Sequence, residues 1–306
     1  MKSRCSWPGN DMKQLVIISG KGGTGKTVLS AALADLAENI VIADCDVDAS
    51  NLHYFLKPEI QETHTFFGNK KARIIPENCT QCGRCIEVCR FDALHASASG
   101  IPSLERISCE GCAVCSLVCP SAAIAMEPAP VGEWFLSHTA YGPFVHARLG
   151  IAEENSGKLV SEVRKNALEL AQEQRRDLVI IDGPPGMGCP VIASLAGTDL
   201  AVVVVEPTPS GIQDMERVLL TANHFKITTA CCINKYDLNS TLSAKIENWC
   251  TQKTIPIVGR IPYDAKVIEA VIKGIPPSSY LNNSTAEAFT AVWKETQKLL
   301  TQETKP

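Results

Sequence analysis

Eight cysteines in two tandem runs constrain this chain more than any other feature. The first run contains Cys79, Cys82, Cys85 and Cys89, and the second contains Cys109, Cys112, Cys115 and Cys119. Both runs follow the spacing C-x2-C-x2-C-x3-C, and each cysteine of the first recurs thirty positions later. A short segment with this many regularly spaced thiols must fold around whatever those thiols bind.

The spacing predicts two [4Fe–4S] clusters. The first three thiolates of such a run bind one cubane, whereas the fourth ligates the other cluster. The predicted ligands of the first cluster are therefore Cys79, Cys82, Cys85 and Cys119, and those of the second are Cys89, Cys109, Cys112 and Cys115. The second run ends in Cys119-Pro120, as the bacterial pattern does, whereas the first has Arg90 at that place.

Structural zinc and disulfides are the alternatives for these cysteines. Zinc ribbons use pairs of C-x2-C knuckles instead of quartets repeated in tandem. Disulfides need an oxidising compartment, and we expect no signal peptide here. Residues 1–11 are expected to form an unstructured leader before Met12. The cysteine content therefore favours a reducing cytoplasm. For the cysteines outside the runs, the default is a small buried side chain; these are Cys5, Cys45, Cys189, Cys231, Cys232 and Cys250.

The composition is that of a globular protein. The 306 residues are 45% hydrophobic and 20% charged, which is enough chain for one large core and a small second domain. A formal net charge of −4 gives no electrostatic reason to expect nucleic acid as a partner. No apolar run approaches the length of a membrane span.

Outside the cysteine runs, short apolar segments alternate with helical patterns. The expected strands are 15–18, 40–43, 178–181, 201–205, 229–233 and 255–258. Ser210 with Gln213 resembles a capping box that opens one of the helices. Strands that alternate with helices predict an α/β fold, a parallel sheet covered by helices on both faces. We expect this domain to span residues 12–70 and 129–306, with residues 71–128 as a small inserted α+β domain.

A phosphate-binding loop follows the first predicted strand. The motif G-x4-G-K-[ST] is complete, and its residues are Gly20, Lys21, Gly22, Gly23, Thr24, Gly25, Lys26 and Thr27. Glycines let the backbone N–H groups converge on phosphate oxygens at the start of a helix. Lys26 is predicted to bridge the β- and γ-phosphates, and Thr27 to offer its hydroxyl to Mg²⁺. The predicted cofactors are therefore ATP or ADP and Mg²⁺.

The additional lysine in this loop narrows the family. Lys21 makes the motif resemble the deviant P-loop of the MinD/ParA/Mrp superfamily, which includes the nitrogenase iron protein. The resemblance implies a dimer that closes over two ATP molecules, with Lys21 reaching the phosphates of the partner subunit. It also implies that Asp46 positions the attacking water, with Asp44 and Asp48 as nearby alternatives. Hydrolysis is expected to be slow without a partner. Residues 71–128 resemble a bacterial two-cluster ferredoxin domain.

The same resemblance assigns three further residues. Asp182, at the end of a predicted strand, holds Mg²⁺ through water, and the N–H of Gly186 contacts the γ-phosphate. Asn234 binds adenine, or is a turn residue, and Pro262 lines the base pocket. Cys189 lies where the nitrogenase iron protein has a cluster cysteine. We expect a buried or regulatory thiol there, with a bridging ligand as the alternative.

Two departures from the superfamily bear on function. The C-x-x-C near the C-terminus of Mrp-type carriers is absent from this sequence. The last predicted helix mixes Lys with Glu, so it is not a membrane-targeting helix. Our first hypothesis is an ATPase that gates low-potential electron transfer with a redox partner. The alternative is an ATP-dependent factor for metallocofactor assembly or iron–sulfur cluster delivery. A positioning ATPase with redox-sensing clusters is a third. Homodimers and heterodimers with a sister ATPase are both compatible with the sequence.

Overall fold

The computed structural model describes residues 12–150 and 156–302, which form two compact units. Unit 1 comprises Met1–Thr63, Trp134–Arg148 and Ser156–Pro306, and unit 2 comprises His64–Glu133 and Leu149–Asn155. Residues 71–128, predicted to be an insert, lie within unit 2. The predicted leader, residues 1–11, lies outside the described residues. Within the described residues, no helix is both long and apolar enough to cross a bilayer.

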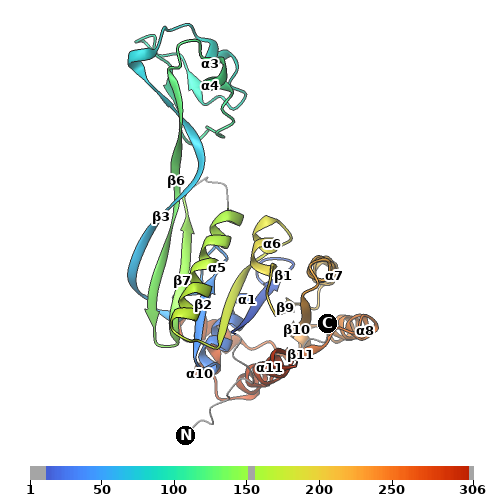
Figure 1. Cartoon of the computed structure of the whole chain (residues 1–306). Coiled ribbons are helices and arrows are strands. Elements are labelled where there is room, and N and C mark those ends of the chain that lie inside the picture. The colour runs from blue at the N-terminus through green and yellow to red at the C-terminus, as the bar shows by residue number, and fades with distance from the viewer. Residues whose placement is uncertain (1–11, 151–155, 303–306) are drawn as a thin grey trace. The chain divides into compact units, whose positions relative to one another are not determined.

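Unit 1 is organised around a largely parallel sheet (Figure 1). The strand order is β11-β10-β9-β1-β8-β2-β7-β6-β3. The strands are β1 (Lys13–Ser19), β2 (Ile40–Asp44), β3 (Glu59–Ile74), β6 (Ile124–Thr139), β7 (Gly142–Leu149), β8 (Leu178–Pro185), β9 (Leu200–Val205), β10 (Thr228–Asn234) and β11 (Ile257–Ile261). β1 pairs in parallel with β8 and β9, β2 with β8 and β7, and β10 with β9 and β11. The α/β fold with a parallel-dominated sheet is therefore confirmed.

Both faces of this sheet are buried at its central strands. Side chains alternate between the faces of a strand, yet Leu15, Val16, Ile17 and Ile18 are all fully buried. The covering helices are α1 (Lys26–Leu36), α5 (Ser156–Glu173), α6 (Cys189–Leu195), α7 (Pro209–His224), α8 (Ser240–Gln252), α9 (Ala265–Lys273), α10 (Pro277–Tyr280) and α11 (Ser284–Thr301). α1 contacts α10 and α11, whereas α5 contacts α6. Burial of consecutive residues explains why the strands are continuous apolar runs in the sequence.

Two details of the predicted elements are wrong. The last strand, β11, begins at Ile257, so Ile255 and Pro256, the first two residues of the predicted strand, lie before it. The N-cap of α7 is Thr208, whose side chain accepts a hydrogen bond from Gly211 N, and not Ser210. Pro209 occupies the first helical position, where its missing N–H costs nothing. The helix therefore begins one residue before the predicted capping box.

Unit 2 has a thirty-residue internal repeat in its backbone. Its short elements are η1 (Pro76–Asn78), α3 (Arg84–Glu87), β4 (Leu94–His95), β5 (Ser103–Leu104) and α4 (Val114–Val118). Residues with positive φ recur in pairs thirty positions apart, namely Gln81 and Gly111, Gly83 and Ala113, and Asp92 and Ala122. The hydrogen bond from Ile75 N to Ala123 O is matched by one from Glu105 N to Ala93 O. The two cysteine runs therefore lie on two copies of one backbone path.

Candidate functional site

The phosphate-binding loop lies between β1 and α1, as the sequence predicts for such a motif. Gly23 and Gly25 have φ angles of +80° and +89°, in the left-handed region that favours glycine. A Cβ at position 25 would lie 2.2 Å from Asn234 Nδ2. Asn234 Nδ2 donates to the carbonyl of Thr24 at 2.7 Å, and Asn234 Oδ1 accepts from Lys235 N. The loop is thus tied to the end of β10 through Asn234.

Lys26 is the centre of a buried charge network. Its Nζ lies 3.1 Å from Asp182 Oδ1 and 3.3 Å from Asp46 Oδ2. Nζ also lies 3.4 Å from Thr27 Oγ1. Ser30, one turn further along α1, donates to Asp182 Oδ1 at 2.7 Å. Four of the predicted site residues, namely Lys26, Thr27, Asp46 and Asp182, therefore lie together, and Ser30 is an additional residue that the sequence did not predict.

The electrostatics of the network favour a charged lysine. Burial opposes the charge on Lys26, but the carboxylates of Asp182, Asp46 and Asp44 outweigh it, so its pKa is raised. Burial raises the pKa of Asp46 as well, against the attraction of Lys26. An ammonium in this place is suited to bind phosphate oxygens, because phosphate can take over the charge pairing that the carboxylates now supply.

The three candidate aspartates after β2 have different surroundings. Asp44 is fully buried and accepts hydrogen bonds from Ser50 Oγ at 2.7 Å, Asp46 N at 3.0 Å and Leu52 N at 3.3 Å. Burial, with repulsion from Asp182, raises the pKa of Asp44 to about 7. Asp48 is exposed. Asp44 therefore braces the loop, and Asp46 is the one of the three whose carboxylate contacts Lys26.

Two buried oxygen atoms in the network have no hydrogen-bond partner among the described residues. They are Asp182 Oδ2 and Thr24 Oγ1. A buried acceptor without a partner costs free energy, so such atoms mark positions where a ligand completes the hydrogen bonding. An unpaired carboxylate oxygen beside a hydroxyl residue such as Thr27 is the donor set that Mg²⁺ prefers, together with water. The residues present therefore fit Mg²⁺.

Lys21 is held by the segment between β9 and α7. Its Nζ donates to Thr208 Oγ1 at 3.1 Å and Ser210 Oγ at 3.3 Å, and it lies 3.9 Å from Glu206 Oε2. Glu206 also pairs with Lys235 Nζ at 2.5 Å. Lys21 therefore has polar partners within its own chain. These partners could not be predicted from the sequence, because they lie nearly two hundred residues from Lys21.

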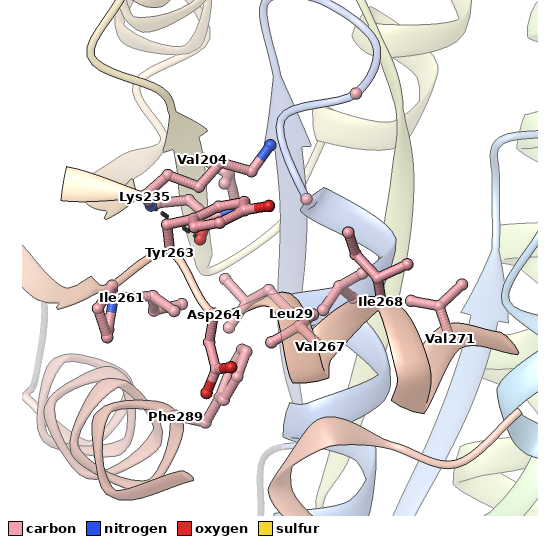
Figure 2. A pocket seen from close by; sticks show the side chains of 15 residues that line it. Leu29, Val204, Lys235, Ile261, Tyr263, Asp264, Val267, Ile268, Val271 and Phe289 are labelled. Carbon is pink, nitrogen blue, oxygen red and sulfur yellow. Dashed lines mark hydrogen bonds between the residues drawn. The ribbon is translucent and has the colours of Figure 1, made fainter. Parts of the chain in front are cut away.

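Two cavities flank the loop. One of about 550 Å³ is lined by the loop residues, Asp46 and Pro185. The other, of about 210 Å³, is mostly apolar, and Figure 2 shows side chains of α1, β9, α9 and α11 around it, among them Leu29, Val204 and Phe289. Asn234 and Pro262, the predicted base-side residues, both line this second cavity. An apolar cavity beside a phosphate loop is suited to a nucleotide base.

The residues after β8 differ from the prediction in part. The N–H of Gly186 donates to Ser19 O at 2.9 Å, and the φ angle of Gly186 is +93°. Cys189 is exposed at the first position of α6, so its predicted burial is wrong. Helix α6 turns its own Val191 and Leu195 inward, which leaves Cys189 outside. Cys45, Cys231, Cys232 and Cys250 are buried, as predicted for cysteines in apolar runs.

In unit 2 the eight cysteines line two small cavities in two groups of four. The first cysteine cavity is lined by Cys79, Cys82, Cys85 and Cys119. The second cysteine cavity is lined by Cys89, Cys109, Cys112 and Cys115. The fourth cysteine of each run therefore lies beside the first three of the other run. Its sulfur also accepts a backbone hydrogen bond, from Ala93 N to Cys89 at 3.4 Å and from Ala123 N to Cys119 at 3.2 Å.

The thiols at the two cavities interact with each other. Burial raises the pKa of Cys85, and the thiolates of Cys82 and Cys119 add to the increase. Burial likewise raises the pKa of Cys115, with repulsion from its three cavity partners. Among the described residues, no three His, Cys, Asp or Glu side chains are arranged around a single metal ion. A cubane is larger than one ion and binds each thiolate at a different iron, so its four ligands stand further apart.

The sequence is similar to one family of nucleotide-binding domains and to proteins from archaea. Residues 15–277 match the sequence model described as "CobQ/CobB/MinD/ParA nucleotide binding domain". The protein MJ0578 of Methanocaldococcus jannaschii is 36% identical over 233 residues, which cover 74% of this chain and 79% of that protein. The "Iron-sulfur cluster carrier protein" of Pyrococcus horikoshii is 22% identical over 295 residues, which cover 90% of this chain and 82% of the relative.

Solved structures share the fold. The septum site-determining protein MinD of Pyrococcus horikoshii, complexed with Mg-ADP, superposes with a TM-score of 0.57 at 18% identity. The match covers 96% of this chain and all of that one. At this level of identity the likeness concerns the fold and does not assign individual residues.

Proposed function

The chain belongs to the CobQ/CobB/MinD/ParA nucleotide-binding domain family, and from this premise we propose that it is an ATPase that gates electron transfer. In the proposal, unit 1 binds and hydrolyses ATP, and unit 2 holds two [4Fe–4S] clusters that exchange single electrons with a partner protein. The observation that carries the proposal is the closed set of four thiols at each cysteine cavity. Complete ligand sets are typical of clusters that remain bound while electrons pass.

The loop residues would hold the nucleotide. Lys26 would exchange its carboxylate partners for phosphate oxygens, and Thr27 with Asp182 would hold Mg²⁺, which neutralises charge on the phosphates. Asp46, released from Lys26, would orient the attacking water and accept its proton late in the reaction. Asn234 keeps the loop in place through Thr24 O. The apolar cavity lined by Leu29 and Val204 would take the base and exclude water from it.

Dimerisation is part of the proposal. Lys21 would leave its partners in the β9–α7 segment and bind the phosphates of a second subunit. Its contacts with Thr208, Ser210 and Glu206 are hydrogen bonds and a 3.9 Å ion pair at a half-exposed position. Such contacts are individually worth about 1 kcal/mol or less, so a triphosphate can compete for the lysine. We expect Lys21→Ala to lose ATP-dependent dimerisation and to keep its iron; dimerisation of that variant with ATP contradicts this role.

Unit 2 supplies the redox part. The thiol sets fit cubanes, because each cavity gathers four cysteines and apolar side chains, and a backbone N–H already donates to one sulfur of each set. The clusters would accept and release single electrons when bound. The sulfur hydrogen bonds and the surroundings of each cavity set the potential at which this occurs.

Iron–sulfur cluster delivery is the second candidate. It is favoured by the relative from Pyrococcus horikoshii whose name is "Iron-sulfur cluster carrier protein" and which matches 90% of this chain. The two candidates differ in whether iron leaves the protein during ATP turnover. Complete four-cysteine sets favour retention over release.

The test is anaerobic purification followed by iron and sulfide analysis and EPR of the reduced protein, with and without Mg-ATP. The proposal predicts about eight irons per chain and EPR signals that change with nucleotide at constant iron content. Release of iron on addition of ATP supports delivery instead. Lys26→Met is the matched control, because it should bind little nucleotide and keep both clusters. Wild-type EPR signals that do not change when ATP is added rule out coupling between ATP and the clusters.

A further inference from the structure

The two cysteine cavities are repeats of one backbone path, but their linings differ in charge. Arg84 lines the first cysteine cavity, and Val114 lines the second. The two residues are thirty positions apart, and each is the first residue of a short helix, α3 or α4, directly after a left-handed N-cap residue, Gly83 or Ala113. Arg84 is exposed, and its guanidinium forms no ion pair with the residues that the structure describes. The internal repeat therefore provides a matched comparison of arginine with valine.

Two further pairs of equivalent residues differ in the same direction. Thr80 lines the first cysteine cavity where Glu110 lines the second, and Ser121 lines the first where Phe91 lines the second. The second cavity thus has a carboxylate and a phenyl ring at positions where the first has two hydroxyls.

The difference has an electrostatic consequence. A site that accepts an electron becomes more negative by one charge. A nearby guanidinium and polar side chains stabilise that charge, whereas a carboxylate and an apolar lining destabilise it. At each of the three compared positions, the first cavity has the residue that favours the reduced form more.

We propose that the two sites are unequal in potential, and that Arg84 is the positioning residue that keeps the electron at the first cysteine cavity. A protein that holds one electron then holds it at the site of Cys79, Cys82, Cys85 and Cys119 and not at the other site. The exchange is balanced, because the second site is oxidised by one electron as the first is reduced by one. The inference rests on the proposed function, since it requires clusters at both cavities. It goes beyond the proposed function by stating which of the two sites of unit 2 holds the electron.

The experiment is a potentiometric titration of the full chain, without nucleotide, followed by EPR. Two one-electron steps are expected, with at least a tenfold preference for the first site, which is 59 mV for a one-electron couple. Arg84→Val introduces the residue that the other repeat has at this position. It should lower the potential of the higher step by about 59 mV, which is about a tenfold change in the equilibrium constant. Val114→Arg should raise the lower step. The double variant Arg84→Val/Val114→Arg should bring the two steps together or reverse them.

The control is Arg106→Val, which removes the same charge from an exposed residue that lines neither cavity. Iron content is measured in every sample. Eight irons with two unresolved steps, or a shift of the lower step by Arg84→Val, overturns this inference and leaves the proposed function standing. A shift by Arg106→Val equal to that of Arg84→Val also overturns it, because the effect would then not belong to the cavity. A wild-type chain that binds no iron overturns the proposed function, and this inference with it.

Discussion

Removal of the ammonium of Lys26 should destabilise unit 1 strongly. The change Lys26→Met keeps the apolar stem and deletes the charge. The lost partner is buried, since the exposed fractions of the side chains are 6% for Lys26, 0% for Asp182 and 11% for Asp46. Loss of one partner of a buried ion pair costs about 3–5 kcal/mol, because the remaining charge has no compensation. We expect a loss of about 3 kcal/mol at pH 8, the low end, because Ser30 still donates to Asp182.

The loss should depend on pH with a defined sign. Burial raises the folded-state pKa of Asp46 above its unfolded value, and without Lys26 the attraction that opposes this increase is lost. The folded variant then binds more protons than the unfolded chain between those pKa values, so its stability falls as the pH rises. The deficit of Lys26→Met should therefore be larger at pH 8 than at pH 5.5. The double change Lys26→Met/Asp46→Asn should recover part of the loss at pH 8.

Urea unfolding followed by tryptophan fluorescence measures this effect. Trp134, Trp249 and Trp293 lie in the described part of unit 1, and the sequence segments of unit 2 contain no tryptophan, so the signal of these three residues reports on unit 1. The control is Lys13→Met. Lys13 lies 3.2 Å from Asp199, but both side chains are 34% exposed, so its loss should cost less than about 1 kcal/mol. A Lys26→Met variant as stable as Lys13→Met at pH 8, or a deficit that grows toward acid pH, would refute the reasoning.

Two further predictions concern one buried histidine and one cysteine. Burial lowers the pKa of His146, which is stacked between Phe135 and Phe144, to about 4. This residue should therefore lower the stability by about 3 kcal/mol as the pH drops from 6.5 through 4, and His146→Phe should remove that contribution from the measured pH profile; a profile with an unchanged slope contradicts the assignment. Cys89→Ala should lose the iron of the second cysteine cavity and retain that of the first, which is measured as about half the iron per chain. The control Cys250→Ala should retain the iron of both cavities. Loss of iron from the first cavity in Cys89→Ala would show that the two ligand sets are reversed.

The sequence predicts the buried strands well because their physical signal is local. β1, β2, β8, β9 and β10 are runs of consecutive apolar residues, which is what burial of both sheet faces requires. β3 and β6 were not predicted as strands of sixteen residues each, because most residues of β3 are exposed and polar. Without burial there is no apolar alternation to recognise.

In the functional site, too, the sequence predicts the structure of contiguous motifs but not the contacts between residues far apart in the chain. The loop from Gly20 to Thr27 is a contiguous motif, so its strand, turn and helix follow from neighbouring residues. The partners of Lys21 come from a segment near position 208, and only the folded sheet brings β1 beside β9. Cys189 was expected to be a buried or a regulatory thiol, and its exposed position at the start of α6 contradicts the first of these two options. Burial of a single side chain depends on which side of its helix faces the core.

Both lysines of the loop are neutralised within the chain, and this suggests how nucleotide binding would act on other parts of the protein. Lys26 is paired with Asp46 and Asp182, and Lys21 with Glu206. If the triphosphate of its own subunit takes over Lys26 and that of the second subunit takes over Lys21, carboxylates are freed that repel the phosphates, so the segments that bear these carboxylates must move or bind Mg²⁺. Asp182 is fixed within β8 and is suited to Mg²⁺, whereas Asp46 lies in a loop. The chain passes from that loop through α2 (His53–Leu56) into β3, and β3 continues into the unit that bears the cysteines. Displacement of Asp46 is therefore the step by which occupancy of the loop would reach unit 2, and Asp46→Asn should weaken the response of the clusters to ATP more than it weakens ATP binding.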